Sequence, residues 1–316
     1  MKYLRVIFSA LFVGVVWFSF GQSLNDAGTA FNEAIQLQKD QQNDQAIEAY
    51  KKCIGIASQL GPEGDDLKMK SQTQLSNLFL SKGIDAYKSK DPDNAIVFLS
   101  ESYNYAETTG DTDGMQKANK MLGSVFSYKG KLALKEKDFN ASIDFLNKAI
   151  GYNPDTDYYY YLVYAYSKND DETNMKAAMD KLIEIGGNDN EDVVKAKSVV
   201  SKFYLANAVD AAKKQDYNKV IEIVNTGFAY DDKDPMAYYY LAVAHNSLNQ
   251  YDKAIQAAEA GIGMEKEDAS NFFFEAGKAY EGLGKNDKAC ENYKKVTQGP
   301  NLEAAKYQIT TVLKCH

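Results

Sequence analysis

The chain has 316 residues, of which 45% are hydrophobic and 25% are charged, enough for a well-buried core or a stack of small repeats. It carries 36 Lys and Arg against 44 Asp and Glu, and its formal net charge is −8. Arg5 is its single arginine. Lysine cannot make arginine's paired hydrogen bonds to guanine or phosphate, so we expect no nucleic-acid partner and no affinity for anionic membranes.

Residues 1–21 have the three parts of a secretory signal peptide in order. Lys2 and Arg5 form a basic start, an apolar run extends from Val6 to Phe20, and small residues precede a cleavage site after Gly21. A membrane anchor is the alternative, but the run is short for a span and no basic stop-transfer cluster follows. We therefore expect export to the periplasm or the extracellular space, with no stable membrane span after cleavage.

The rest of the chain, residues 22–316, reads as a series of helix pairs. Near the start of each expected second helix stands one small or apolar residue, and these residues are Ala46, Ala95, Ser142, Met175, Val220, Ala254 and Ala289. Three of the intervals between them are about 34 residues, and the other three are roughly 11–15 residues longer. The additional residues keep helical spacing, for example from Asp65 to Ser89 and from Glu191 to Lys214, so they predict long first helices.

Three of these segments align without effort: FNASIDFLNKAIGYNP at 139–154, YDKAIQAAEAGIGME at 251–265 and NDKACENYKKVTQGP at 286–300. Each follows the small residue with apolar residues at helical spacing. The last two are each preceded by a second amphipathic stretch and a short turn, which is typical of an αα-hairpin.

This pattern resembles the tetratricopeptide repeat, and the chain is similar to an exported bacterial protein of that family. The residues that match its small and large packing positions are Ala46, Gly83, Ala95, Gly130, Ala149, Leu241, Ala242, Ala254, Gly277, Tyr280 and Ala289. The resemblance implies an all-α, right-handed superhelical solenoid of about seven helix pairs. The number of repeats between Asp170 and Val220 stays open, because the unit at Met175 is degenerate.

The last stretch, Asn301 to Lys314, has helical spacing but no partner helix, so we expect a capping helix over the final repeat. We expect one solenoid domain, with a candidate flexible joint in the loop at 186–192.

An exported protein permits disulfides, and Cys290 and Cys315 lie on helices that should be antiparallel neighbours. A helix count leaves the ends of these two helices out of step by about 10 Å, unless the helices tilt or the last turn unwinds. Cys53 is expected as a buried free thiol.

Residues that could carry catalysis are few. Two histidines, His245 and His316, lack cysteine partners at metal spacing, and neither a phosphate-binding glycine loop nor a nucleophile motif is present. We therefore expect no enzyme activity, no metal and no cofactor.

Aromatic residues are unusually abundant, with 23 Tyr and 15 Phe, and consecutive runs occur at 158–161, 238–240 and 272–274. The family pattern buries one ring per run, here Tyr159, Tyr238 and Phe273. By analogy with the family, other rings would face the concave groove, and the candidate partner-binding residues are Tyr160, Tyr164, Tyr239 and Phe274.

We therefore expect a monomeric scaffold or adaptor in the cell envelope that binds a protein or peptide in the concave groove. The acidic balance of the chain favours a neutral or basic partner. The alternative is a module that binds glycan or another cell-envelope polymer, because rings with polar tips also stack on sugars.

Overall fold

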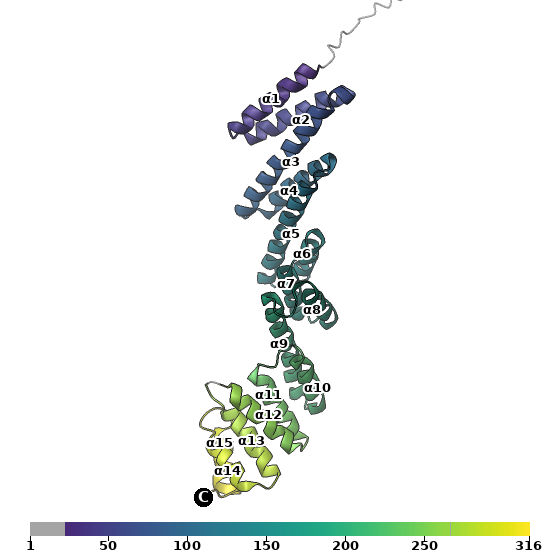
Figure 1. Ribbon diagram of the computed structural model, residues 1–316. Coiled ribbons are helices and arrows are strands. Elements are labelled where there is room, and N and C mark those ends of the chain that lie inside the picture. The colour runs from purple at the N-terminus through teal and green to yellow at the C-terminus, as the bar shows by residue number, and fades with distance from the viewer. Residues whose placement is uncertain (1–22, 266) are drawn as a thin grey trace, which may run out of the picture. The chain divides into compact units, whose positions relative to one another are not determined.

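The computed structural model describes residues 23–265 and 267–316 (Figure 1). The expected signal peptide, residues 1–21, lies outside the described residues. Within the described part of the chain there are fifteen α-helices, two short helical turns and no strand. The prediction of an all-α chain is therefore confirmed.

Fourteen of the helices form seven consecutive pairs. The first helices of the pairs are α1 (Leu24–Lys39), α3 (Asp65–Lys88), α5 (Thr112–Lys135), α7 (Thr156–Lys168), α9 (Glu191–Lys213), α11 (Pro235–Ser247) and α13 (Ser270–Gly282). The second helices are α2 (Asn43–Gln59), α4 (Pro92–Thr109), α6 (Phe139–Tyr152), α8 (Glu172–Gly186), α10 (Tyr217–Phe228), α12 (Tyr251–Met264) and α14 (Asn286–Lys294). A 3-10 turn, Gly61–Glu63, precedes α3. The predicted seven helix pairs are thus present, including the degenerate pair at Met175.

Apart from α1, which has 16 residues, the first helices come in two lengths, as the intervals in the sequence predict. Helices α3 and α5 have 24 residues and α9 has 23, whereas α7, α11 and α13 have 13 each. The long helices account for the three long intervals.

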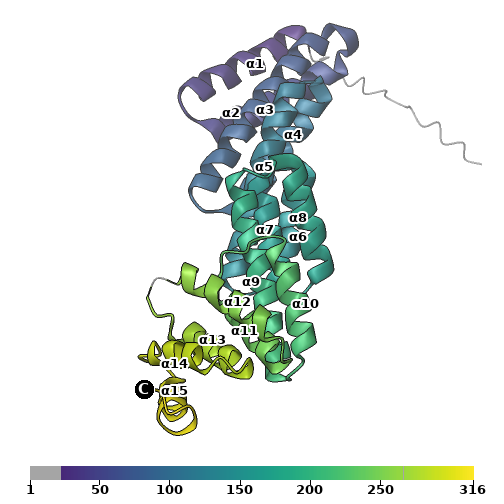
Figure 2. The same ribbon diagram turned by 60° about the horizontal axis from the view of Figure 1, so that its bottom comes forward.

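The chain divides into two compact units, and the boundary falls within α5, between Leu122 and Gly123. The first unit contains α1 to α4 and the start of α5. The second contains the rest of α5 and the helices from α6 to the C-terminus (Figure 2). The candidate joint at 186–192 therefore lies inside the second unit, where it connects α8 to α9, and its flexibility stays a prediction.

The same turn joins the two helices of every pair. Two residues before each second helix, the backbone adopts the left-handed conformation, with φ from 56° to 72°. The residue after it donates its N–H to the carbonyl five residues back, at 2.8–3.0 Å. This is the 6→1 bond of a Schellman motif, which satisfies a carbonyl at the end of the first helix. The left-handed residues are Gln41, Lys90, Lys137, Asp170, Gln215, Asn249 and Gly284.

Small and large residues face one another where the two helices of a pair cross. The residues near the start of the second helices, Ala46 to Ala289 in the series above, are all 0% exposed. One turn later stands a residue that packs on the first helix. A Cβ added at Gly83 would lie 2.6 Å from Leu99 Cγ, at Gly130 2.8 Å from Leu146 Cγ, and at Gly277 2.7 Å from the Tyr293 ring. These glycines allow the helices to approach closely, as the resemblance implies.

The expected register of the aromatic runs is wrong by one residue. Tyr158 and Phe272 are the buried rings, at 6% and 2% exposed, whereas Tyr159, Tyr238 and Phe273 are half-buried. In α11 the equivalent buried residue is Ala237. The buried position is the third residue of each short first helix, and the family pattern was aligned one residue too late.

The C-terminal cap is only partly an α-helix. Helix α15 (Leu302–Tyr307) continues as a π-helical turn, Gln308–Val312, beyond which the chain leaves the helix. This unwinding removes the mismatch in the helix count. Cys315 reaches Cys290 of α14 and forms a disulfide with a Cα–Cα distance of 5.7 Å. Cys53 is a free thiol and fully buried.

Candidate functional site

The four candidate rings are all half-buried, and most of them pack against other rings. Tyr160 contacts Tyr161 edge to face, with centroids 4.9 Å apart. Tyr239 meets the buried Phe272 ring at 6.0 Å, also edge to face. Because these contacts occupy part of each ring, Tyr160 and Tyr239 contribute to the core as well as to the surface.

Tyr164 is the candidate that lines two pockets, one on each side of α7. One pocket of about 530 Å³ lies between α5 and α7 and is lined by Tyr128, Lys131, Leu132, Leu134, Lys135, Tyr161 and Tyr164. A second, of about 160 Å³, lies between α7 and α9 and is lined by Tyr164, Ser167, Lys168, Val199, Lys202, Phe203 and Ala206. The Tyr164 ring therefore forms the ridge between them. We call the residues that line these two pockets the tyrosine–lysine face.

Every charged residue that lines the tyrosine–lysine face is a lysine. Lys131 pairs with Asp157 at 2.7 Å and lies 4.3 Å from the Tyr161 ring centroid. Lys168 lies 5.4 Å from the centroid of Tyr164. Within the described chain, Lys135, Lys168 and Lys202 form no ion pair with a carboxylate. The face is therefore locally basic in a protein whose net charge is acidic.

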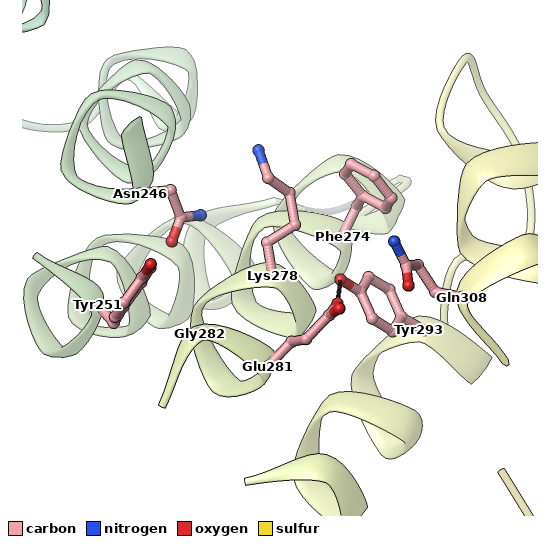
Figure 3. Close-up of a pocket in the computed structure, with 8 residues that line it drawn as sticks. All are labelled: Asn246, Tyr251, Phe274, Lys278, Glu281, Gly282, Tyr293 and Gln308. Atoms are coloured by element: carbon pink, nitrogen blue, oxygen red, sulfur yellow. Dashed lines mark hydrogen bonds between the residues drawn. The ribbon is translucent and has the colours of Figure 1, made fainter. Parts of the chain in front are cut away.

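The largest of the pockets described here, of about 670 Å³, lies at the C-terminal end of the second unit (Figure 3). We call it the C-terminal pocket. It is lined by Asn246, Tyr251, Phe274, Lys278, Glu281, Gly282, Tyr293 and Gln308. Phe274, a candidate from the sequence, forms part of its wall and contacts Tyr293 at 5.7 Å. Neither Tyr160 nor Tyr239 is among the described residues that line any of these three pockets.

Buried polar groups anchor one end of the C-terminal pocket. Asn246, 7% exposed, donates from Nδ2 to the backbone oxygen of Glu275 at 2.9 Å and to Glu275 Oε2 at 2.7 Å. The Glu275 carboxylate, 4% exposed, also accepts from Lys278 Nζ at 3.1 Å. The charges of Glu275 and Lys278 therefore offset each other.

The other end of the pocket depends on α14 and the C-terminal cap. Tyr293 is fully buried and donates its hydroxyl to Glu281 Oε2 at 2.7 Å. Burial, together with this hydrogen bond, raises the pKa of Tyr293, so its hydroxyl stays protonated and continues to donate. Gln308 belongs to the π-helical turn that precedes the disulfide-bonded Cys315.

His245 has a packing role. It is 8% exposed, and its Nδ1 donates to Gln250 Oε1 at 2.8 Å. Burial lowers the pKa of His245, and the Gln250 hydrogen bond opposes that shift only in part. No group of His, Cys, Asp and Glu side chains in the described chain has an arrangement that could hold a metal ion. None of its helices combines the length and apolarity that a membrane crossing requires.

Comparisons with known proteins agree with this architecture. The tetratricopeptide repeat family model matches residues 37–60, 129–156 and 270–298. The TPR repeat-containing protein YpiA of Bacillus subtilis (strain 168) is 35% identical over 63 residues, covering 20% of this chain and 15% of that protein. The chain thus aligns with only a small part of that relative.

Among solved structures, the chain is similar to other tetratricopeptide repeat proteins at low identity. A tetratricopeptide repeat protein from Parabacteroides merdae ATCC 43184 is 14% identical with a TM-score of 0.31, covering 92% of this chain and 99% of that one. The TPR2AB domain of yeast Sti1, solved in a complex with pHSP90, is 14% identical with a TM-score of 0.34, covering 92% and 96%.

Helix pairs with small residues at their crossings place the chain among the α-helical repeat proteins, which commonly serve as scaffolds for other proteins. Three segments match the family model, and each contains the whole second helix of a pair, namely α2, α6 or α14. The family model therefore identifies tetratricopeptide repeats in these three segments of the chain.

Of the four candidate rings, Tyr164 and Phe274 line pockets, and the polar residues that line the same pockets were not among the candidates from the sequence. Lys168 follows Tyr164 by four residues, and Asn246 occupies the last turn of α11. The spacing of Lys168 from Tyr164 is a signal that the sequence offers, since residues four apart share a helix face. The position of Gln308 carries no such signal, because the π-helical turn that places it is not visible in the sequence.

Proposed function

We propose that the protein is a non-enzymatic adaptor of the cell envelope that holds an extended segment of a partner protein on its tyrosine–lysine face. The observation that carries this proposal is the Tyr164 ridge between two pockets, each of which also contains at least one lysine without a carboxylate partner. Tyrosine supplies a large rigid contact at low entropic cost, and such residues dominate binding energy in protein interfaces.

The charge of the face indicates the chemistry of the segment. Lys135, Lys168 and Lys202 favour carboxylates on the partner at this place, whereas the net charge of the whole chain favours a neutral or basic partner. A local surface decides which groups meet on docking, so we expect an acidic stretch of the partner here. Other parts of the same partner can carry the opposite charge.

Export to the periplasm or the extracellular space is part of the same proposal. Its support is the order of basic, apolar and small residues in 1–21 and the Cys290–Cys315 disulfide, since such bonds persist in oxidising compartments.

The test is affinity purification of the tagged mature protein from the envelope fraction, followed by quantitative mass spectrometry of the retained proteins. Tyr164→Ala should lower retention of the partner about tenfold or more, and Lys202→Glu should lower it through charge reversal. Tyr307→Ala and Lys176→Glu are matched controls, because Tyr307 is 58% exposed on α15 and Lys176 is exposed on the second helix α8.

Two outcomes would count against the proposal. If Tyr164→Ala leaves retention unchanged, the tyrosine–lysine face is not the binding surface. If the mature protein retains polysaccharide and no specific protein, the glycan-binding alternative replaces the adaptor.

A further inference from the structure

The C-terminal pocket contains two amide oxygens that have no hydrogen-bond partner. Asn246 Oδ1 and Gln308 Oε1 are both buried and unpaired. Figure 3 shows Asn246 and Gln308 at opposite ends of the pocket, with Phe274, Lys278 and Glu281 between them. An unpaired buried acceptor costs free energy, so two of them in one pocket suggest that a ligand satisfies them.

The orientation of the Asn246 amide follows from its partners. Its nitrogen lies 2.9 Å from the Glu275 backbone oxygen and 2.7 Å from Glu275 Oε2, and both of these atoms accept hydrogen bonds. A flipped amide would place its oxygen, which can only accept, against both of these acceptors. The side-chain oxygen of Asn246 is therefore the group left for a ligand, and the ligand atom that meets it must be a donor.

Charge in the pocket favours a basic ligand. Lys278 is engaged by the buried carboxylate of Glu275, whereas Glu281 receives one hydrogen bond from the neutral Tyr293 hydroxyl and no ion pair among the described residues. Because Tyr293 stays protonated, Glu281 contributes an uncompensated negative charge. Phe274 and Tyr251 supply aromatic walls, against which a cation, and a guanidinium above all, can stack.

The shape of the pocket favours a peptide over a free cation. The pocket has a volume of about 670 Å³, and its two acceptors lie at opposite ends. One planar guanidinium therefore cannot contact both acceptors. An extended peptide presents N–H donors along its backbone and side chains on alternate sides. The amide oxygens can therefore accept from the backbone while Glu281 meets the side chain.

We propose that the C-terminal pocket binds an arginine-containing stretch of the partner protein. The arginine side chain pairs with Glu281 between the aromatic walls, and backbone N–H groups on either side donate to Asn246 Oδ1 and Gln308 Oε1. This second proposal rests on the proposed function, because it assigns another contact between the same adaptor and its partner. It requires that the partner have a basic stretch that reaches the C-terminal pocket.

The C-terminal cap is part of this site. Gln308 lies in the π-helical turn, and the Cys290–Cys315 disulfide holds that end of the chain on α14. The acceptor at this end of the pocket is therefore present only while the cap is docked.

The test uses the peptide Gly-Ser-Gly-Arg-Gly-Ser-Gly and its twin with citrulline, the neutral isostere of arginine, with binding to the mature protein followed by ligand-observed NMR titration. The arginine peptide should bind about tenfold more tightly than the citrulline peptide. Glu281→Gln should abolish that preference. Its control is Glu303→Gln, an equal charge change at an exposed residue of α15 outside the pocket.

Gln308→Leu separates binding from folding. It removes an acceptor that has no partner in the protein, so the melting temperature should stay the same or rise while arginine-peptide binding weakens several-fold. Gln256→Leu, at an exposed position of α12, is the matched control and should leave binding unchanged.

Three results would overturn the inference. They are equal binding of the arginine and citrulline peptides, a Gln308→Leu variant that melts lower and binds as before, and free arginine that binds as tightly as the peptide. The Tyr164→Ala variant should bind the arginine peptide normally. Failure of the adaptor proposal at the tyrosine–lysine face is therefore distinguishable from failure at this pocket.

Discussion

At the residue scale, Gly83 shows how closely the helices of a pair approach. A Cβ at this position would lie 2.6 Å from Leu99 Cγ and 3.2 Å from the Leu99 backbone nitrogen, and Leu99 is 0% exposed. A branched carbon packed on all sides cannot rotate away, so α3 and α4 must separate. We expect Gly83→Ala to lower the free energy of unfolding by about 1–3 kcal/mol.

Gly55, in the interior of α2, is the control for this prediction. A Cβ there meets nothing within 4 Å, so Gly55→Ala should stabilise the same unit by about 0.5–1 kcal/mol through helix propensity alone. Urea denaturation followed by circular dichroism measures both variants. Equal effects in the same direction would show that the contact at Gly83 does not matter.

The buried residues at the helix crossings could be predicted from the sequence, because a small or apolar residue recurs at this position in each repeat. All seven residues that marked the second helices are fully buried. The aromatic runs were harder. In a run such as Tyr158 to Tyr161 every position is aromatic, so composition does not identify the buried one, and the expected register was one residue too late. The unpaired oxygens of Asn246 and Gln308 depend on tertiary contacts that no pattern of residue types reveals.

At the element scale, the turn between paired helices is uniform, whereas its sequence is not. The left-handed position is glycine only in the last pair, where Gly284 has φ 72°. In each of the other six pairs a residue with a side chain occupies it, with φ from 56° to 61°. A side chain in this region carries a steric cost of about 1–2 kcal/mol, which the Schellman hydrogen bond and the packing of the helices offset.

Lys137 provides a direct test of that cost. Its φ is 61°, and it lies between α5 and α6. Lys137→Gly should raise the free energy of unfolding by about 0.5–1 kcal/mol, because glycine enters the left-handed region without the Cβ clash. Lys135→Gly, in the last turn of α5, should instead lower it by up to about 1 kcal/mol. A thermal melt of the two variants beside the wild type would refute this account if Lys137→Gly melted lower.

The lengths of the helices could be predicted from the sequence, but the structure of the C-terminal cap could be predicted only in part. The long intervals in the sequence require the long helices α3, α5 and α9, because the additional residues keep helical spacing. The cap was expected as one helix from Asn301 to Lys314, yet α15 ends at Tyr307 and a π-helical turn follows. The π-helical turn has only five residues, which is too short for periodicity to distinguish it from the end of an α-helix.

At the scale of the whole molecule, charge and function are distributed unevenly. The net charge of −8 describes the chain, but the tyrosine–lysine face has lysine as its only charged lining residue and the C-terminal pocket has an uncompensated carboxylate. A partner that engages both sites needs an acidic stretch and a basic stretch. The net charge of the chain therefore does not describe the charge of either site.

The compartment and the redox state of the molecule can be tested together. The leader in 1–21 predicts cleavage after Gly21, and the Cys290–Cys315 bond leaves Cys53 as the single free thiol. Intact mass of envelope-purified protein should match a chain that begins at Gln22 and is two hydrogens lighter than its reduced form. Thiol counting in denaturant should find one thiol before reduction, and none in a Cys53→Ala variant.

Loss of the bond should also weaken the cap. A cross-link over a sequence separation of 25 residues typically contributes about 2–4 kcal/mol, so Cys290→Ser should destabilise the second unit by that order. Because Gln308 lies in the segment that the disulfide holds, the same variant should bind the arginine peptide less tightly. A purified protein that retains residues 1–21 would contradict cleavage after Gly21. Three free thiols in the same sample would contradict the disulfide and, with it, the proposed fixation of the pocket by the cap.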